Sequence, residues 1–113
     1  LPAGEPIVKA AFSCCGSGAF LKALKAAGRR QVVLCGIETH VCVLQTALDL
    51  LELGYEVAVV CDAVSSRSAD HRACALRRME RAGADIACVE MLLYEWMRTA
   101  EHPAFRNILK LVK

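Results

Sequence analysis

The sequence predicts an α/β domain with a doubly wound parallel sheet and helices on both faces. Short apolar segments typical of buried strands alternate along the chain with segments whose apolar residues recur at helical spacing. The strand segments at 31–35 and 55–61 each contain a continuous apolar run, at 32–35 and 57–61, which indicates burial on both faces of the sheet. Strands joined by helices run parallel, with right-handed crossovers. At 113 residues the chain has room for a single domain, residues 1–113.

Local signals place each element. The helical segments have apolar residues three or four positions apart, and Gly28, Gly54 and Gly83 end three of them, because glycine readily takes the left-handed conformation of a helix end. Pro103 suits the first turn of a helix. In chain order we expect a strand at 6–8, a helix at 17–27, a strand at 31–35, a helix at 41–51, a strand at 55–61, a helix at 69–82, a strand at 85–89, a helix at 90–99 and a last helix from Pro103 to about 111.

Composition and charge limit the possible partners. The chain is 56% hydrophobic with a mean hydropathy of +0.37, so it must bury most of its apolar surface or cover some of it with a partner. Net charge is +2, and the basic residues fall at helical spacing typical of solvated helix faces, so no nucleic-acid partner is expected. No apolar run approaches the ~20 residues of a membrane span, and no leader pattern is present, so no membrane association is expected.

Seven cysteines are the second compositional signal. An odd count without regular spacing argues against a disulfide framework and indicates a reducing compartment, the cytoplasm. With three scattered histidines and no C-x-x-C pair, neither a metal site nor a cofactor is expected. Cys14 and Cys15 are adjacent, which makes a redox pair a weaker hypothesis beside two loop thiols. The remaining cysteines other than Cys42 are expected as small buried hydrophobes: Cys35, Cys61, Cys74 and Cys88.

Ligands of parallel α/β sheets bind beyond the carboxyl ends of the strands, which makes Cys42 the first candidate. It follows a strand and lies in the first turn of a helix, where unpaired N–H groups and the helix dipole favour a thiolate. The same N–H groups could hold an oxyanion formed when the sulfur attacks a carbonyl. Simple packing explains Cys42 as well, because cysteine is among the residues most often buried.

Lys9 is the second candidate. It directly follows the expected strand at 6–8 and is followed by an apolar stretch, so it is poorly explained as part of a solvated face. An ammonium near Cys42 would favour the thiolate and polarise a bound carbonyl. An edge strand with Lys9 pointing outward is an equal alternative.

Other polar residues near the strand ends have structural explanations. Thr39 suits a helix N-cap, and His40 is expected to be pocket wall or surface, because a side chain two residues from Cys42 on a helix points elsewhere. Asp62 is expected to give structural support. The polar loop at 65–68 could bind a substrate carboxylate, and helix-capping serines explain it equally well.

The segment 32–67 resembles the isochorismatase-like cysteine hydrolases, and within them the branch of isochorismatase domain-containing proteins. The residues that carry the resemblance are G-I-E-T-H-V-C-V-L-Q-T-A at 36–47, then G-Y-E-V at 54–57 and D-A at 62–63. Upstream, K-A-A-F-S at 9–13 is similar to the lysine segment of the family. The resemblance spans nearly the whole chain.

The resemblance implies a Cys–Lys–Asp triad, with Cys42 as nucleophile and Lys9 as the lysine. It also implies a cis peptide between Ile37 and Glu38, which would aim the Glu38 N–H alongside the Cys42 N–H as an oxyanion hole. A non-proline cis bond costs about 3 kcal/mol. Because the cysteine is present, the implied reaction is hydrolysis of an amide, carbamoyl or related acyl group of a small molecule through a covalent thioester.

One element of the implied triad has no match. The family's aspartate precedes its lysine at the end of the first strand, whereas every aspartate of this chain follows Lys9. The chain is therefore expected to be the C-terminal portion of the domain, without the N-terminal strand or strands, and inactive when isolated. A homo-oligomer or a complementing N-terminal part is the expected partner. The alternative is a non-catalytic binding or assembly module that retains the fold.

Overall fold

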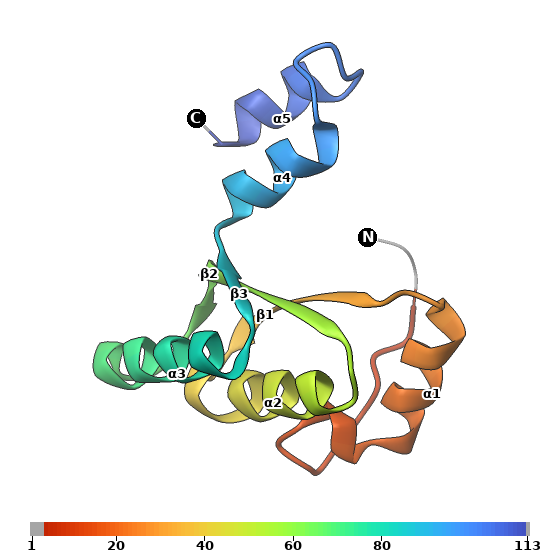
Figure 1. The fold of residues 1–113 in the computed structure, drawn as a ribbon, viewed down its shortest axis with the longest axis vertical. Coiled ribbons are helices and arrows are strands. Elements are labelled where there is room, and N and C mark those ends of the chain that lie inside the picture. Colours follow the sequence, from red (N-terminus) through yellow and green to blue (C-terminus); the bar gives the residue numbers. More distant parts are fainter. Residues whose placement is uncertain (1–3, 113) are drawn as a thin grey trace.

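The structure, a computed structural model, describes residues 4–112. A three-stranded sheet forms the centre, with helices before, between and after its strands (Figure 1). The strands are β1 (Gln31–Ile37), β2 (Glu56–Ser65) and β3 (Asp85–Ala87). The helices are η1 (Cys14–Gly16), α1 (Gly18–Ala27), η2 (Thr39–Val43), α2 (Leu44–Glu52), α3 (Ala69–Ala82), α4 (Val89–Met97) and α5 (Phe105–Val112).

The sheet is parallel with strand order β1-β2-β3, which confirms the predicted α/β class. Val32 lies opposite Val57, and Val59 opposite Ile86. The register of β1 and β2 shifts between Leu34 and Gly36, so extra residues of β2 bulge near its carboxyl end. Bulges re-aim the chain next to functional sites, and this one lies beside the turn that leads to Cys42.

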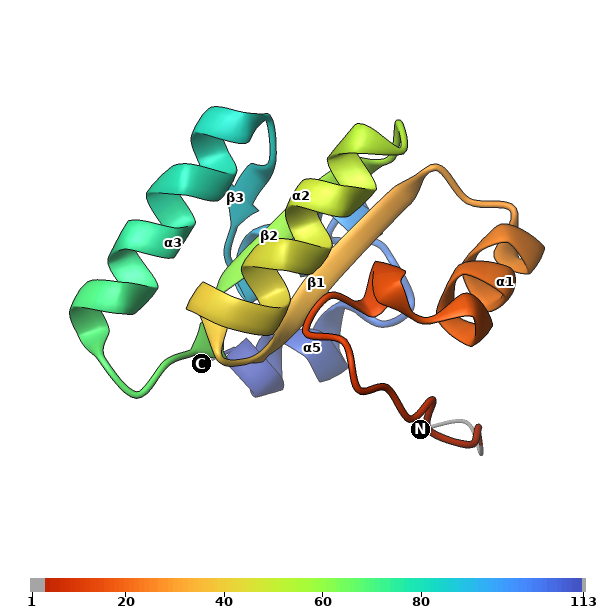
Figure 2. The same cartoon turned by 90° about the horizontal axis from the view of Figure 1, so that it is seen from below.

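Helices lie on both sides of the sheet. Figure 2 shows α2 and α3 side by side over one face, and the α4–α5 pair lies on the other side. The core forms under α2 and α3, where Leu50, Val59 and Met79 are fully buried. The second face is less covered, because α4 packs mainly against β2 and α5 packs against α4.

This uneven cover corrects the prediction that the strands at 31–35 and 55–61 are each buried on both faces of the sheet. The prediction holds for the middle of β2, where Val57, Val59 and Val60 are buried. It is wrong for β1, whose residues alternate between exposed and half-buried. Ile37 is 77% exposed, and the contacts of α4 with the sheet lie mainly on β2.

The segment before η1 differs most from expectation. The strand predicted at 6–8 is wrong: residues 4–9 form no regular element, and Val8 is 92% exposed. A strand needs a ladder partner, and the partner of β1 in the described sheet is β2. Lys9 therefore lies in an irregular segment that continues into η1.

The helix ends follow the local signals closely. Ser17 and Ser68 accept backbone hydrogen bonds at the starts of α1 and α3, and Gly28 and Gly83 end these helices with φ of 64° and 112°. The predicted strand at 85–89 is shorter, because Val89 already begins α4. The last helix starts at Phe105, beyond the turn that contains Pro103.

Candidate active site

The structure brings Lys9 and Cys42 together. The Lys9 ammonium lies 3.7 Å from the Cys42 sulfur, in hydrogen-bond geometry. It also donates to the backbone oxygens of Ala11 and Phe12, each at 2.8 Å. A lysine ammonium has three hydrogens, so all three are directed: two at carbonyls of its own segment and one at the sulfur. Cys42 is half-buried, and so is Lys9.

The turn from β1 into the Cys42 helix is built without a cis bond. All peptides in residues 4–112 are trans, so the cis peptide expected between Ile37 and Glu38 is wrong for this structure. The chain reverses instead through positive φ angles, 145° at Gly36 and 59° at Glu38. A left-handed residue other than glycine costs on the order of 1–3 kcal/mol, which the surroundings must supply. The turn then enters η2, a π-helical turn that contains Cys42.

Two basic side chains contact the carboxylate of Glu38. The Arg67 Nε lies 3.2 Å from one oxygen, and the His40 Nε2 lies 3.5 Å from the other. The second oxygen is buried and has no hydrogen-bond partner. The Arg67 side chain is 82% exposed, so its attraction for Glu38 is screened and contributes little to stability. The contacts instead orient the strained residue toward the loop after β2.

The end of β2 and the loop after it form two further hydrogen bonds with the turn. The Thr39 hydroxyl donates to the Ser65 carbonyl at 2.9 Å, so Thr39 bridges two strand ends and does not cap its own helix. The His40 Nδ1 lies 2.9 Å from the Ser66 hydroxyl. The His40 ring also lies 5.0 Å from the ring of His71, centroid to centroid. The half-buried His40 side chain therefore contacts both Ser66, in the loop after β2, and His71, in α3.

The polar residues in the last part of β2 and after it have mostly structural partners. Ser68 caps α3 by accepting from the His71 N–H. Asp62 accepts from the Val89 N–H at 2.9 Å, so it supports the start of α4, as predicted.

The segment that carries Lys9 is held by contacts that the sequence did not indicate. The Cys14 N–H donates to the Thr46 hydroxyl of α2 at 2.9 Å. Ser13 accepts from the Cys15 N–H, and Gly16 leaves room for Ala11, since a Cβ on Gly16 would lie 2.5 Å from the Ala11 methyl. No local sequence pattern predicts these contacts, because each depends on the three-dimensional path of the loop.

The cysteines differ in their surroundings. Cys35 and Cys74 are exposed, so the prediction that they are buried is wrong, whereas Cys61 and Cys88 are half-buried. Burial raises the pKa of the Cys15 thiol, and the hydrogen bond with Ser13 partly opposes this, while the negative charge of Asp49 and neighbouring Cys14 make smaller contributions that raise the pKa. Within residues 4–112 no group of three or more metal-ligating side chains converges. In that part of the chain, no helix is long and apolar enough to cross a bilayer.

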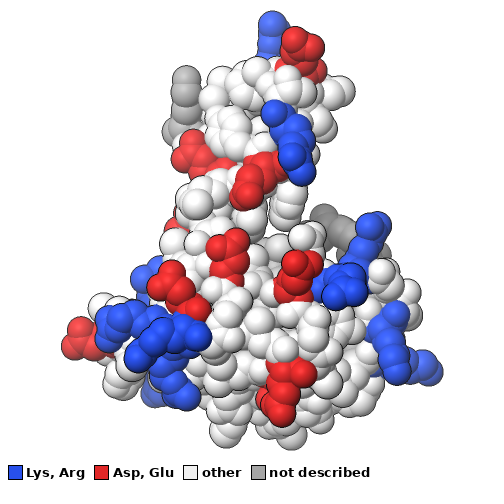
Figure 3. Space-filling model, viewed as in Figure 1, with Lys and Arg blue, Asp and Glu red and all other residues white. Residues whose placement is uncertain are grey.

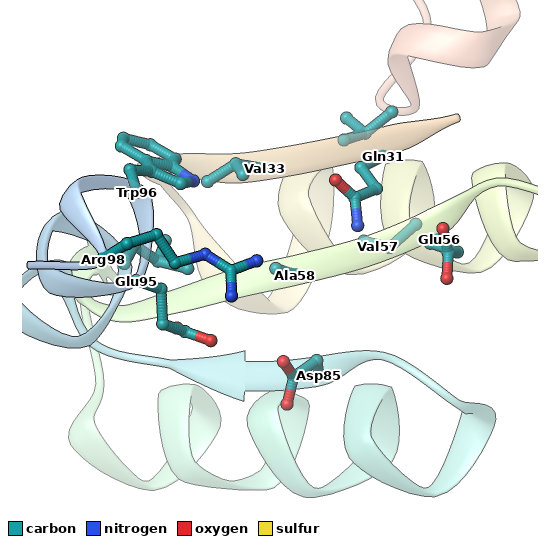
Figure 4. A pocket seen from close by; sticks show the side chains of 11 residues that line it. Gln31, Val33, Glu56, Val57, Ala58, Asp85, Glu95, Trp96 and Arg98 are labelled. Atoms are coloured by element: carbon teal, nitrogen blue, oxygen red, sulfur yellow. The ribbon is translucent and has the colours of Figure 1, made fainter. Parts of the chain in front are cut away.

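A cavity of about 330 Å³ lies elsewhere, between the second face of the sheet and α4 (Figure 4). Glu56, Asp85 and Glu95 line it together with Arg98. Neither Lys9 nor Cys42 reaches it, so the cavity is separate from the candidate site. On the face shown in Figure 3, acidic and basic side chains are interspersed, and lysines and arginines gather on two sides, around α3 and near α1. That the chain binds no nucleic acid remains a prediction.

The comparisons with known proteins identify the family of the chain. The model of the Isochorismatase domain matches residues 1–91. The chain belongs to the isochorismatase domain family. It is 47% identical to mouse isochorismatase domain-containing protein 2A over 110 residues, which cover 96% of this chain and 52% of the relative. It thus spans about half the length of that relative.

Two solved structures share the fold of this family member. One, named MAR1 ribonuclease from Caenorhabditis elegans, matches with a TM-score of 0.83 and 44% identity, covering 92% of this chain and 53% of that one. The other is the YcaC gene product of Escherichia coli, described as an octameric hydrolase of unknown specificity. It matches with a TM-score of 0.81 and 29% identity, covering 93% of this chain and 58% of that one. Related structures therefore include an octamer.

Proposed function

We propose that this chain carries the nucleophile and the lysine of a cysteine hydrolase that cleaves an amide, carbamoyl or related acyl group of a small molecule. The observation that carries the proposal is the 3.7 Å separation between the Lys9 ammonium and the Cys42 sulfur. A cation at hydrogen-bond distance from a thiol is one of the arrangements by which a cysteine nucleophile is activated. Family membership supports the hydrolytic class of the reaction.

In the proposed reaction, the Cys42 sulfur forms a bond to the carbonyl carbon of the substrate. The tetrahedral intermediate then collapses, the bond to the leaving amine or alcohol breaks, and the thiol proton goes to that leaving group. A water molecule hydrolyses the remaining thioester, which releases the acid and restores the thiol. Lys9 stabilises the thiolate, and the N–H groups of Glu38 and Cys42 are the proposed donors to the oxyanion.

The proton must be carried by a carboxylate, which the family resemblance implies to be an aspartate ahead of the lysine. No aspartate occurs in residues 1–8. In the described part of the chain, the two contacts between basic side chains and a carboxylate both involve Glu38, and neither includes Lys9. We therefore expect residues 1–113 alone to turn over no substrate.

Alkylation of Cys42 tests the pairing without requiring turnover. We expect Lys9→Met to slow the reaction of Cys42 with iodoacetamide at neutral pH at least about fivefold, the factor that corresponds to ~1 kcal/mol of lost attraction for the thiolate. Lys22→Met, which changes an exposed lysine of α1, is the matched control. Peptide mass spectrometry separates Cys42 from the exposed Cys35 and Cys74, whose rates should not change. Equal Cys42 rates in all three proteins would refute the proposal.

Substrate panels of amides, carbamates and RNA extend the test to the reaction, with the complementing segment present. RNA is included because the C. elegans relative is named a ribonuclease. Any hydrolysis by the proposed mechanism must disappear in Cys42→Ala. RNA cleavage that persists in this variant would contradict the proposal.

The second candidate is a non-catalytic binding or assembly module. It is favoured by the lack of a carboxylate paired with Lys9 in residues 4–112. We propose a homo-oligomer in the cytoplasm for either function, a state supported by the octameric relative. The two functions differ in the alkylation experiment, since a binding module gives no reason for Cys42 to react faster than other half-buried thiols.

A further inference from the structure

Two hydrogen bonds join the segment 4–16 to the helix that carries Cys42. One is the contact between Lys9 and the Cys42 sulfur. The other is donated by the Cys14 N–H to the Thr46 hydroxyl, at 2.9 Å. Thr46 is 2% exposed, so its hydroxyl is part of the protein interior. Both bonds therefore attach the segment 4–16 to the helical stretch formed by η2 and α2.

The geometry connects the two bonds closely. The π-helical turn η2 continues directly into α2, and Thr46 follows Cys42 by four residues, which places both on one side of the helix. On the facing segment, Lys9 precedes Cys14 by five residues. Between them the ammonium donates to the Ala11 and Phe12 oxygens, so the segment is closed on itself into a compact loop. Moving the loop at Cys14 moves the ammonium with it.

Both groups of the bond, the Thr46 hydroxyl and the Cys14 N–H, gain from being paired with each other. A buried hydroxyl without a hydrogen-bond partner is costly, and so is an amide that loses its acceptor. The Ser13 hydroxyl accepts from the Cys15 N–H, so the neighbouring amide already has its own partner. The Cys14 N–H is the donor that reaches across to α2.

We propose that Thr46 is a positioning residue that sets the distance between the Lys9 ammonium and the Cys42 sulfur through its hydrogen bond to the Cys14 backbone. The inference rests on the proposed function, in which this distance decides the reactivity of Cys42. Thr46 itself touches neither reacting atom. Its hydroxyl fixes the loop, and the loop fixes the lysine.

Two matched pairs of variants test the inference from both ends of the bond. Thr46→Val removes the acceptor at similar volume, and Thr46→Ser keeps it. Cys14→Pro removes the donor, and Cys14→Ala keeps it. Proline is compatible with this place, because Ser13 before it is extended (φ −72°, ψ 136°) and Cys14 begins the short helix η1. Cys14→Pro also lies outside the core, so it reports on the bond even if Thr46→Val fails to fold.

The readout is the rate of Cys42 alkylation at neutral pH, with Cys35 and Cys74 as internal controls for each variant. We expect Thr46→Val and Cys14→Pro each to slow Cys42 about three- to tenfold, the factor of a typical net hydrogen bond. Thr46→Ser and Cys14→Ala should stay close to the unmodified rate. In a Lys9→Met background, removing the bond should have no further effect.

The background variant separates the positioning role from the proposed function. If Lys9→Met slows Cys42 but Thr46→Val and Cys14→Pro do not, the positioning role is overturned while the proposed function stands. If they slow Cys42 equally in the Lys9→Met background, Thr46 acts by another route and the inference is also overturned. If Lys9→Met has no effect, both the proposed function and the positioning role are rejected.

Discussion

The candidate site has two arms that are held in different ways. The nucleophile arm, residues 36–52, is anchored by side chains in the core, among them Thr39, Ala47 and Leu50, each 0% exposed. The lysine arm, residues 4–17, contributes one buried side chain, that of Ser13. Packing thus fixes the sulfur, whereas a few hydrogen bonds and one close steric contact fix the ammonium.

This difference separates stability from site geometry. Buried apolar side chains supply most of the free energy that holds a small domain together. Substitutions in the nucleophile arm should therefore lower the stability of the whole chain. Substitutions in the lysine arm should change the Lys9–Cys42 pairing and leave the rest of the fold largely intact.

The largest expected effect is in the nucleophile arm. Leu50→Ala removes a fully buried side chain of α2 and should lower the free energy of unfolding by about 2–5 kcal/mol. The matched control is Leu53→Ala three residues later, where a side chain 57% exposed should cost no more than about 0.5 kcal/mol. Urea denaturation followed by circular dichroism measures both. Similar losses at the two positions would mean that the core does not lie under α2 as described.

A smaller and more local effect is expected in the lysine arm. A Cβ on Gly16 would lie 2.5 Å from the Ala11 methyl, so Gly16→Ala must push Ala11 away, and the Ala11 carbonyl is one of the acceptors of the Lys9 ammonium. We expect Cys42 alkylation to slow several-fold, with a stability loss near the low end of the usual overpacking range, about 1 kcal/mol. Mass spectrometry of alkylated peptides and urea denaturation measure the two quantities.

The chain offers both a control and a rescue for this prediction. Gly18→Ala is the control, because no atom lies within 4 Å of a Cβ at that position. Adding Ala11→Gly to Gly16→Ala removes the clashing methyl and should restore the Cys42 rate. If the double variant alkylates as slowly as Gly16→Ala, the steric contact is not what positions the lysine.

The two arms also differ in how far the sequence predicts them. Much of the nucleophile arm is local: a strand, Gly36 at the turn, and a helix whose apolar stripe and final glycine are visible in the sequence. The lysine arm depends on contacts between residues more than thirty positions apart, such as Cys14 with Thr46. Its predicted strand at 6–8 rests on apolar character alone, and an apolar segment forms a strand only where a ladder partner is present.

Exposure on the sheet differs from prediction for a related reason. The continuous run of apolar residues at 32–35 is typical of a strand buried on both faces, yet Cys35 is exposed because cover on the second face depends on where α4 packs. The turn at Glu38, where the family resemblance implies a cis bond, uses a left-handed residue held by Arg67 and His40. The Arg67 contact comes from a loop that follows another strand, so no local pattern reveals it.

The smallest expected effect tests whether the lysine arm is docked in solution. Burial raises the pKa of Cys15 above its ordinary value of 9.0, so the folded chain keeps this proton to a higher pH than the unfolded chain does. The resulting stabilisation is fully present below about pH 9 and is lost as the pH rises through the folded-state pKa, because the native state binds more protons in that window. Cys15→Ser removes the titrating thiol.

We therefore expect the free energy of unfolding to fall more between about pH 8 and pH 10 in the unmodified chain than in Cys15→Ser. Urea denaturation at several pH values measures the difference, with Cys35→Ser, at an exposed position, as the control. An identical pH dependence in the unmodified chain and Cys15→Ser would show that Cys15 is solvated in solution. The lysine arm would then be undocked for much of the time, and the short Lys9–Cys42 distance would describe a minor state of the chain.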